Sequence, residues 1–365
     1  MADYDIGAAF RELELSIIRS MSRALAFHNN DVLAEGFDWT MWQAEKLQAL
    51  EAFMAEYGVE CHEKFEEINA EIDKLLKRMY EAGTNAEERR ILSAIKKGYA
   101  ATSSGSFGTI NRTRLNALIR AVKSDMQTAE TAMLRMVDDV YRKAIFNAQA
   151  CYMSGATTLN KAVDMATSDF LSRGINCIEY ANGARVGIDS YAEMALRTAG
   201  TRAKLQGESA ARDDYGINTV IVTYRATACP MCVNWVGKVL YDDVYSNIPT
   251  TAKNYPRLSE AIAEGLYHPN CKDSHTTYFE GISTPRGEGL TPAEKREAKR
   301  VYALQQEQRY NERMIRKYKR LEQGSVSPDN IEKYGTKRAQ WQKRQRELIA
   351  KNGDALRRNY SREQI

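Results

Sequence analysis

The distribution of proline limits the fold of this chain more than any other feature of its sequence. All seven prolines lie at or after Pro230, so the first 229 residues contain none. Because proline disrupts the hydrogen bonds of a helix interior, such a stretch is typical of a helical assembly. Apolar residues recur there every three or four positions, as on one face of a helix. The first such stripe is Ile6, Phe10, Leu13, Ile17, Met21 and Leu25.

Glycines and polar residues suggest where these helices begin and end. We expect Asp38 to cap a helix that continues to Gly58, and a further helix to close at Gly83. Residues 102–108 (Thr-Ser-Ser-Gly-Ser-Phe-Gly) predict a flexible connection. We therefore expect a mainly α fold. Its first two regions are a helical N-terminal region over residues 1–101 and a central helical region over residues 109–216.

A group of cysteines and histidines follows the helices. Cys229 and Cys232 form a C-x-x-C pair, and His268, Cys271 and His275 follow about 35 residues later. A C-x-x-C turn places two thiolates at the separation that a tetrahedral metal ion needs, and a second pair completes the ligands. The alternative is a set of ordinary buried thiols or a disulfide, but the second cluster favours a metal. We interpret the group as a structural Zn²⁺ site built from the three cysteines and one histidine.

The fourth ligand is either His268 or His275. We favour His268, because Pro269 restricts it to an extended conformation close to Cys271. His275 is the alternative ligand, and could instead begin a closing strand. Apolar residues on both sides of the C-x-x-C pair predict a β-hairpin with the pair at its turn. Residues 217–283 are thus expected to form a small α+β module.

Cysteine usage and hydropathy indicate the compartment. Three of the six cysteines lie in this one cluster, which suits a reducing compartment better than a disulfide framework. No apolar run reaches the roughly 18 residues of a membrane-spanning helix, so we expect no membrane contact. The first 30 residues lack the basic and apolar regions of a secretion signal.

The end of the chain is electrostatically distinct. The whole chain has a net charge of +4, but residues 286–365 hold 21 Lys and Arg against 11 Asp and Glu. Thr291 and Pro292 have the types expected at the N-cap and first position of a helix, and Gly324 ends it. A last helix then continues to about Asn352. We expect residues 286–365 to form a basic C-terminal helical arm.

The arm has two interpretations. It is either a solvated charged face or a contact surface for double-stranded DNA, although its acidic residues would repel phosphates. The candidate nucleic-acid-binding residues are Arg309, Arg313, Arg316, Lys317, Lys319, Arg320, Lys337, Arg338, Lys343 and Arg344.

Several short motifs point to a known family. Trp235-Val236-Gly237-Lys238-Val239 follows the C-x-x-C pair, Asn270-Cys271 and Phe279-Glu280-Gly281 lie downstream, and Trp39-x-x-Trp42-Gln43-x-x-Lys46-Leu47 lies near the start. In these motifs the chain resembles the phage minor capsid proteins of the minor capsid protein 2 type, which are related to the Mu F-like head morphogenesis proteins. The family often has a histidine where this chain has Asp273, which leaves the fourth ligand open.

The resemblance implies a structural protein of a tailed bacteriophage. It implies a minor component of the virion, inside the head, whose partners are the portal and major capsid proteins and packaged DNA. It also implies assembly in the bacterial host cytoplasm. The alternatives are a zinc-dependent nuclease or hydrolase and a zinc-stabilised DNA-binding protein. The chain lacks the H-x-E element of zinc deaminases, the H-E-x-x-H helix of zinc proteases and a phosphate-binding loop, so we assign no catalytic residue.

Overall fold

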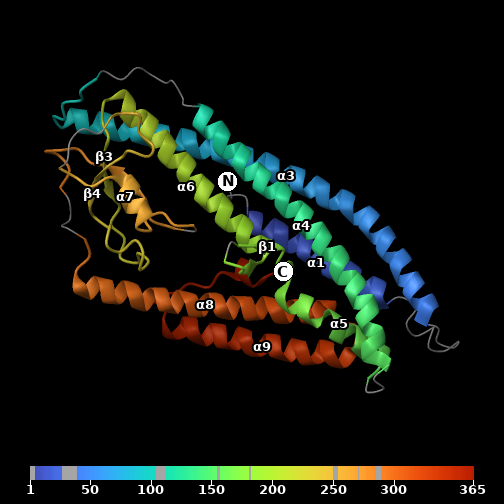
Figure 1. Cartoon of the computed structure of the whole chain (residues 1–365). Coiled ribbons are helices and arrows are strands. Elements are labelled where there is room, and N and C mark those ends of the chain that lie inside the picture. The colour runs from blue at the N-terminus through green and yellow to red at the C-terminus, as the bar shows by residue number, and fades with distance from the viewer. Residues whose placement is uncertain are drawn as a thin grey trace. The chain divides into compact units, whose positions relative to one another are not determined.

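The computed structural model describes most of the chain (Figure 1). The described residues are 5–26, 39–103, 112–153, 157–180, 182–249, 254–269, 271–284 and 289–365. Helices dominate these residues and the strands are few and short, which confirms the mainly α fold class. The predicted N-cap Asp38 and most of the predicted connection at residues 102–108 lie outside the described residues. None of the described helices is both long and apolar enough to cross a membrane.

Long helices form most of the first half of the chain. They are α1 (Ile6–Ala26), α3 (Trp39–Lys96), α4 (Arg112–Met153), α5 (Leu159–Arg173) and α6 (Ile188–Asp214). The apolar stripe predicted for the first helix is buried along α1, from Ile6 at 3% exposure to Leu25 at 1%. The periodicity of the sequence therefore located both the helix and its buried face.

The predicted helix ends at Gly58 and Gly83 are wrong, because α3 is one continuous helix of 58 residues. Gly83 instead allows two helices to approach each other. A Cβ on Gly83 would overlap the backbone oxygen of Lys204 in α6, and a Cβ on Gly207 would overlap that of Tyr80 in α3. Glycine inside a helix costs about 1 kcal/mol relative to alanine. Here it permits a backbone contact that no other residue would allow.

Contacts within the chain define two compact units. Unit 1 comprises Met1–Ile68, Asp125–Glu193 and Gln305–Ile365, and unit 2 comprises Asn69–Ser124 and Met194–Leu304. Each unit combines segments that are distant in sequence, whereas the four regions expected from the sequence follow one another along the chain. That four-region division stays a prediction.

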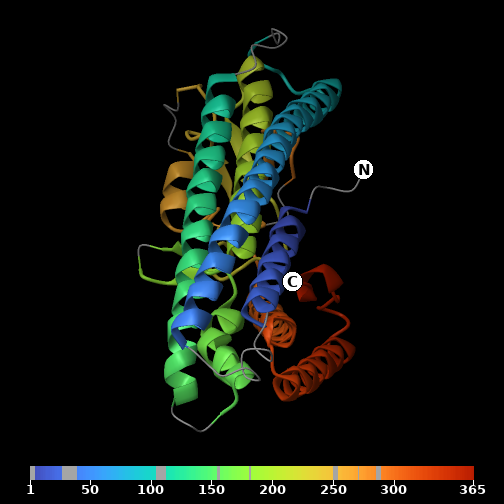
Figure 2. The ribbon, with the colours of Figure 1, turned by 90° about the vertical axis from the view of Figure 1, so that its right-hand side faces the viewer.

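Unit 1 is a helical assembly with one small hairpin. Besides α1 and α5, it contains most of α8 (Pro292–Gly324), α9 (Pro328–Lys351) and the short 3₁₀ helix η1 (Tyr360–Glu363). The two-stranded hairpin consists of β1 (Ile178–Glu179) and β2 (Arg185–Val186). Figures 1 and 2 show the end of α8 and the whole of α9 lying side by side. The predicted last helix is thus present with the expected bounds.

Unit 2 contains the predicted hairpin and a third strand. Strand β3 (Thr219–Val222) lies between β4 (Val239–Tyr241) and β5 (His275–Thr277), and both pairings are antiparallel. The short helix α7 (Leu258–Ala263) precedes β5. A small core unites the sheet with α7 and the cysteine segment; it comprises Val220, Val222, Cys232, Trp235, Leu240, Leu258, Ala261 and Leu266. The sequence predicted β3 and β4 but not α7.

The start of α8 belongs to unit 2 and has the predicted cap. The Thr291 hydroxyl accepts a hydrogen bond from the Glu294 N–H at 3.3 Å, and the Glu294 carboxylate accepts one from the Thr291 N–H at 2.8 Å. Pro292 occupies the first turn. This reciprocal arrangement is a capping box. Leu290, just before it, packs against Ala228 and Val236, so the helix starts against the cysteine segment.

Candidate metal centre

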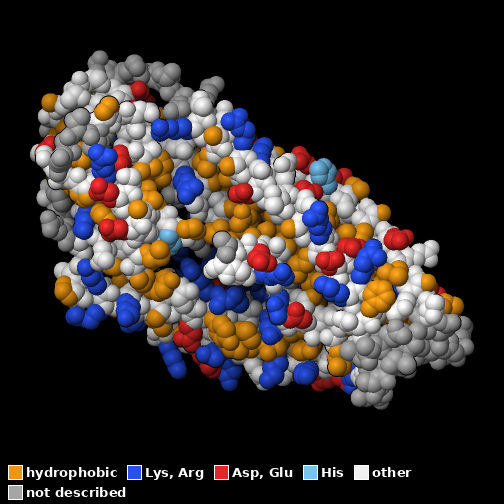
Figure 3. All heavy atoms as spheres, viewed as in Figure 1, with side chains coloured by type: hydrophobic (Ala, Val, Ile, Leu, Met, Phe, Trp, Pro, Cys, Tyr) orange, Lys and Arg blue, Asp and Glu red, His pale blue; other side chains and the backbone are white. Residues whose placement is uncertain are grey.

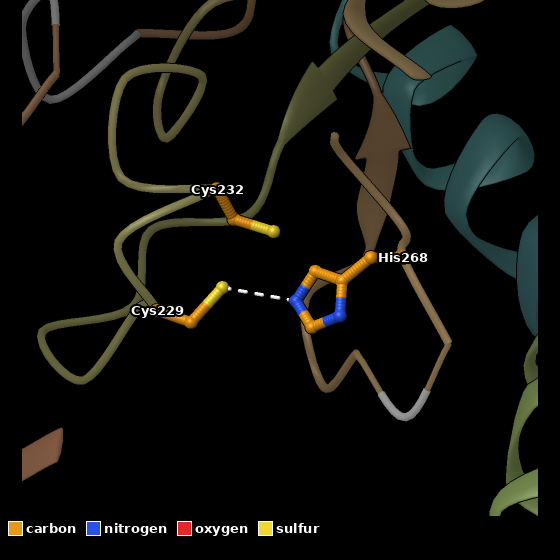
Figure 4. A group of neighbouring side chains, drawn as sticks. All are labelled: Cys229, Cys232 and His268. Carbon is orange, nitrogen blue, oxygen red and sulfur yellow. Dashed lines mark hydrogen bonds between the residues drawn. The ribbon is translucent and has the colours of Figure 1, made fainter. Parts of the chain in front are cut away.

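The C-x-x-C pair lies in a series of tight turns between β3 and β4. The backbone N–H groups of Cys232 and Val233 both donate to the Cys229 carbonyl, at 3.1 and 3.0 Å. The Trp235 N–H then donates to the Cys232 carbonyl at 2.9 Å. These turns bring the Cys229 and Cys232 thiols toward one point, as Figure 4 shows. The local turn is the reason that a two-residue spacing can supply two ligands.

The second pair of donors lies in a reversal of the chain after α7. Gly265 has a φ of +106° and Tyr267 a φ of +58°, which is uncommon for a residue other than glycine. The Cys271 N–H donates to the His268 carbonyl at 2.9 Å. The reversal therefore turns His268 and Cys271 back toward the cysteine turn.

The predicted ligands fall into two overlapping groups among the described residues. The donor atoms of Cys229, Cys232 and His268 lie within 4.8 Å of one another, and so do those of Cys232, Cys271 and Asp273. The Cys229 Sγ lies 3.0 Å from His268 Nε2, and the Cys232 Sγ lies 3.4 Å from the Cys271 Sγ. With metal–sulfur bonds of about 2.3 Å, a tetrahedral ion would separate two thiolates by about 3.8 Å. The Cys232 and Cys271 thiols are thus within a few tenths of an ångström of that separation. The donor types and spacing fit Zn²⁺, although the identity of the ion stays a prediction.

The His268 ring is held in the orientation that a metal ligand needs. Its Nδ1 lies 2.9 Å from the Pro269 carbonyl oxygen, which can only accept a hydrogen bond. The proton must therefore be on Nδ1, and the lone pair on Nε2 faces the Cys229 thiol (Figure 4). Histidines that bind metals commonly donate their other ring nitrogen to a carbonyl in this way.

The Cys232 and Cys271 thiols share a hydrogen bond. The hydrogen bond between them raises the pKa of Cys232 and lowers the pKa of Cys271. The Asp273 N–H also points at the Cys271 Sγ at 3.3 Å, which helps to lower the pKa of that thiol. Cys271 is thus the member of the pair that more readily supplies a thiolate, the form that binds metal.

His275 lies at the start of β5, as the sequence allowed. The residue is 3% exposed, and its Nδ1 lies 2.9 Å from the Tyr267 hydroxyl. Burial, together with the nearby Arg212 guanidinium, lowers the pKa of His275 to about 3, so the ring is neutral near pH 7. Among the described residues, the groups of donors close enough to share an ion include His268 or Asp273, but not His275.

Two charged residues beside the centre were missed as site residues. The Asp273 carboxylate lies within 4.8 Å of the Cys232 and Cys271 thiols, and the Arg225 guanidinium lies 3.2 Å from that carboxylate. Asp273 was noticed in the sequence only as a departure from the family's histidine. Nothing in the sequence around Arg225 marks it as a neighbour of Asp273, since 48 residues separate the two.

A buried ion pair anchors the module to α6. Arg212 and Asp242 are both fully buried, and their nearest side-chain atoms are 2.6 Å apart. The other Asp242 oxygen accepts the N–H groups of Val244 and Tyr245, at 3.3 and 2.8 Å. Although burial alone would raise it, the pKa of Asp242 is lowered because Arg212 stabilises the carboxylate. The sequence carries no signal for this pair.

The candidate nucleic-acid-binding residues fall into two groups. Arg316 and Arg320 serve the interior of unit 1. Arg320 donates to the Leu171 carbonyl at 3.1 Å and pairs with Glu14 at 3.4 Å. Arg316 donates to the Arg362 carbonyl at 2.7 Å, and burial lowers its pKa. Both guanidinium groups therefore have partners within unit 1.

The other eight are exposed or half-buried, and acidic side chains accompany several of them. Arg338 binds the Glu322 carboxylate at 2.6 Å, and Arg344 lies 3.3 Å from Glu307. Figure 3 shows the same mixture, with Asp and Glu scattered among Lys and Arg along α9. The exposed members are Arg313, Lys337, Lys343 and Arg344, and the half-buried members are Arg309, Lys317, Lys319 and Arg338. DNA contact through this face stays a prediction.

Comparisons with known proteins identify the family. The pattern of the family described as "Phage minor capsid protein 2" matches residues 4–350. The "Structural protein" of Lactococcus phage LL-H is 24% identical over 231 residues, which cover 61% of each chain. The chain therefore spans about three fifths of the length of this curated relative. No solved structure matches the chain. Because the family pattern extends over nearly all of its residues, the chain belongs to the Phage minor capsid protein 2 family.

Proposed function

We propose that the chain is a non-catalytic structural component of a phage head, stabilised in unit 2 by one Zn²⁺ ion. The metal rests on two contacts between chain segments 39 residues apart, that of Cys229 with His268 and that of Cys232 with Cys271. The proposed role in the phage head rests on membership of a minor capsid family, whose pattern matches residues 4–350.

The donor set supports a structural rather than a catalytic ion. Structural zinc sites in proteins have four protein ligands, whereas catalytic sites keep one position open for water or substrate. Cys229, Cys232, His268 and Cys271 provide four donors. They adjoin the small core of unit 2, in which Cys232 is fully buried. When bound, the ion would join the β3–β4 connection to the reversal before β5.

The size of unit 2's sheet explains why an ion would help. Its strands are only three or four residues long. Sheets of this size have little apolar area, and small modules of this kind often depend on a metal for stability. Because metal binding is coupled to folding, the ion would contribute most of its binding free energy to the folded state.

The partners and location form the finer part of the proposal. We propose that the protein lies inside the head and contacts the portal and major capsid proteins. The exposed basic residues of α8 and α9 would contact packaged double-stranded DNA. Assembly in the reducing cytoplasm of the bacterial host would keep the thiols available for zinc. Family membership supports a place in the virion, and the charge of residues 286–365 supports the DNA contact.

Purified particles provide the test. Mass spectrometry of intact heads from the producing strain should detect this chain in a fixed ratio to the major capsid protein. Elemental analysis of the purified chain should find about one zinc per chain. A chain absent from particles would contradict the structural role, and a folded chain without metal would contradict the centre. If the purified chain cleaves DNA with its metal retained, the nuclease alternative replaces the proposal.

A further inference from the structure

The two segments that supply the metal ligands are also joined by an ion pair. Arg225 lies between β3 and the cysteine turn, and Asp273 lies between Cys271 and β5. The Arg225 Nη1 is 3.2 Å from the Asp273 carboxylate. The other guanidinium nitrogens bind the segment to which Arg225 belongs. Nε donates to the Thr227 hydroxyl and Nη2 donates to the Thr227 carbonyl, both at 3.1 Å. Arg225 therefore spans the two ligand-bearing segments.

Asp273 is coupled to a ligand through its backbone. Its N–H lies 3.3 Å from the Cys271 Sγ, so the position of Asp273 also determines the position of that hydrogen bond. Its side chain is 1% exposed, whereas that of Arg225 is 27% exposed. Burying a carboxylate is costly unless it is paired with a charge or fully hydrogen-bonded. Arg225 is the cation that the structure places against it.

The neighbouring thiols distinguish this ion pair from an ordinary surface ion pair. Asp273 lies within 4.8 Å of two thiols, those of Cys232 and Cys271, which become negative when they bind a metal. A fourth negative group there would weaken the assembled ligand set unless a cation balances it. Arg225 supplies that balance without occupying the space of the ion.

We propose that Arg225 and Asp273 are positioning residues of the metal centre. Their ion pair holds the cysteine turn and the reversal at the separation that the ion requires, and it thereby raises metal affinity. Neither residue is a ligand in this arrangement. The inference rests on the proposed zinc centre, and it adds the residues that prepare that centre for the ion.

The first experiment compares metal affinity in matched variants. D273N keeps the shape of the side chain and the backbone N–H to Cys271, but removes the charge. R225M removes the guanidinium. Each should lower Zn²⁺ affinity by about 10–100-fold in competition with a chelator, as changes to outer contacts of metal ligands do. The double variant should be little worse than either single variant, because both disrupt the same pair.

Two further variants separate positioning from general stability. Asp243 accepts hydrogen bonds from the N–H and hydroxyl of Ser259 at 2.9 and 2.6 Å, at the start of α7 in the same module. D243N should lower the melting temperature and leave the metal affinity of the folded chain unchanged. R225K should recover part of the affinity, because lysine keeps the charge but cannot also hold Thr227 through a planar fork.

Substitution of Co²⁺ for Zn²⁺ shows whether Asp273 is itself a ligand. Wild type and D273N should give the same thiolate-to-cobalt absorption and the same ligand-field bands, since the ligands are unchanged. Different bands would make Asp273 a ligand and overturn the inference, and so would unchanged Zn²⁺ affinity in both D273N and R225M. A wild-type chain that binds no metal would instead contradict the proposed centre, which keeps the two failures distinguishable.

Discussion

The metal module of unit 2 and the helices α8 and α9, most of whose residues belong to unit 1, were both recognised by polar residues, but for different reasons. In the module, the spacing of a few residues was informative, and the structure places Cys229 beside His268 and Cys232 beside Cys271. In the helices, the total charge was informative about composition alone. Of the basic residues in the arm, Arg320 is 8% exposed and binds backbone carbonyls in the interior.

The difference shows which kinds of sequence pattern predict where side chains lie in the folded chain. A C-x-x-C turn is a local geometric constraint, so its ligand spacing holds wherever the turn is placed. The number of basic residues does not show which of their side chains point into the protein and which point into solvent. Successive turns of one helix can send one arginine inward and the next lysine into solvent. The predictions below use variants of the two regions to challenge this distinction.

Removing a ligand cysteine should have the largest effect. Structural zinc contributes about 10–16 kcal/mol of binding free energy in zinc-finger peptides, and here it would be coupled to the folding of a small module. C229S or C271S should lose the zinc. Residues 220–281 should then lose protection from hydrogen exchange, while the helices of unit 1 keep theirs. Hydrogen-exchange mass spectrometry with elemental analysis measures both.

Cys177 provides the control for this experiment. It is a half-buried thiol of unit 1 that lies outside both donor groups, and burial raises its pKa to about 11. C177S should therefore retain one zinc per chain. Full protection of residues 220–281 in zinc-free C271S would contradict a structural role for the metal.

Removing Arg320 should have the next largest effect. R320M leaves the buried Glu14 carboxylate without its cation and the Leu171 and Ser172 carbonyls without a donor. Breaking a buried pair from one side costs about 3–5 kcal/mol of unfolding free energy. Urea denaturation followed by circular dichroism measures the loss. R313M, at an exposed position of the same helix, should change stability by no more than about 0.5 kcal/mol.

Equal stability of these two variants would contradict the interior role of Arg320. The arm would then be a solvated charged face, as one of the two sequence interpretations held. A large loss in R320M alone would support the division of its basic residues into interior and exposed sets.

The fold was more predictable than the details of its helix ends. Periodicity and the absence of proline located α1 and predicted helices over residues 109–216, where α4, α5 and α6 lie, because an amphipathic stripe is a property of the segment itself. The role of Gly83 was missed, since a glycine that ends a helix and one that admits a neighbouring backbone look the same in sequence. Only the contact with Lys204 distinguishes them.

The candidate site shows the same limit. His268 and His275 both lie within four residues of Cys271, so spacing alone left the choice between them open. Pairing of β5 with β3, which sets His275 opposite Val222, places that ring beside Tyr267. The contact between Arg225 and Asp273 could not be predicted from the sequence for the same reason. Their contact depends on how the sheet closes.

The two histidines should therefore respond differently to substitution. H268A removes a candidate ligand, so it should lower Zn²⁺ affinity by more than the roughly 10–100-fold effect of outer contacts. H275A should leave the affinity close to that of wild type. However, it removes the buried partner of the Tyr267 hydroxyl, which should cost about 1–3 kcal/mol of unfolding free energy. The sequence offered His275 only as an alternative ligand or as the start of a closing strand, and the burial of the residue adds a role in stability.

Chelator competition and thermal melting, applied to both variants, separate the two roles. A weaker metal affinity in H275A than in H268A would reverse the assignment of the fourth ligand. Loss of a hydrolytic activity in one variant, with metal and fold retained, would favour the enzyme alternative.

The smallest stability effects should come from the exposed lysines of α9. K337A and K343A should each change the unfolding free energy by no more than about 0.5 kcal/mol, because both side chains are exposed. If this face contacts duplex DNA, each variant should reduce the slope of log affinity against log salt by about 1. Fluorescence anisotropy with the full chain and a labelled duplex measures that slope. K74A, which changes an exposed lysine of α3 that pairs with Glu71, should leave that slope unchanged.

Affinity that does not depend on salt would assign the face to protein contacts, because releasing counterions from phosphates always produces such a slope. If R320M is destabilised and K337A and K343A reduce the salt dependence of DNA affinity, the basic residues of this segment have two roles. Buried ones such as Arg320 stabilise the fold, and exposed ones bind DNA.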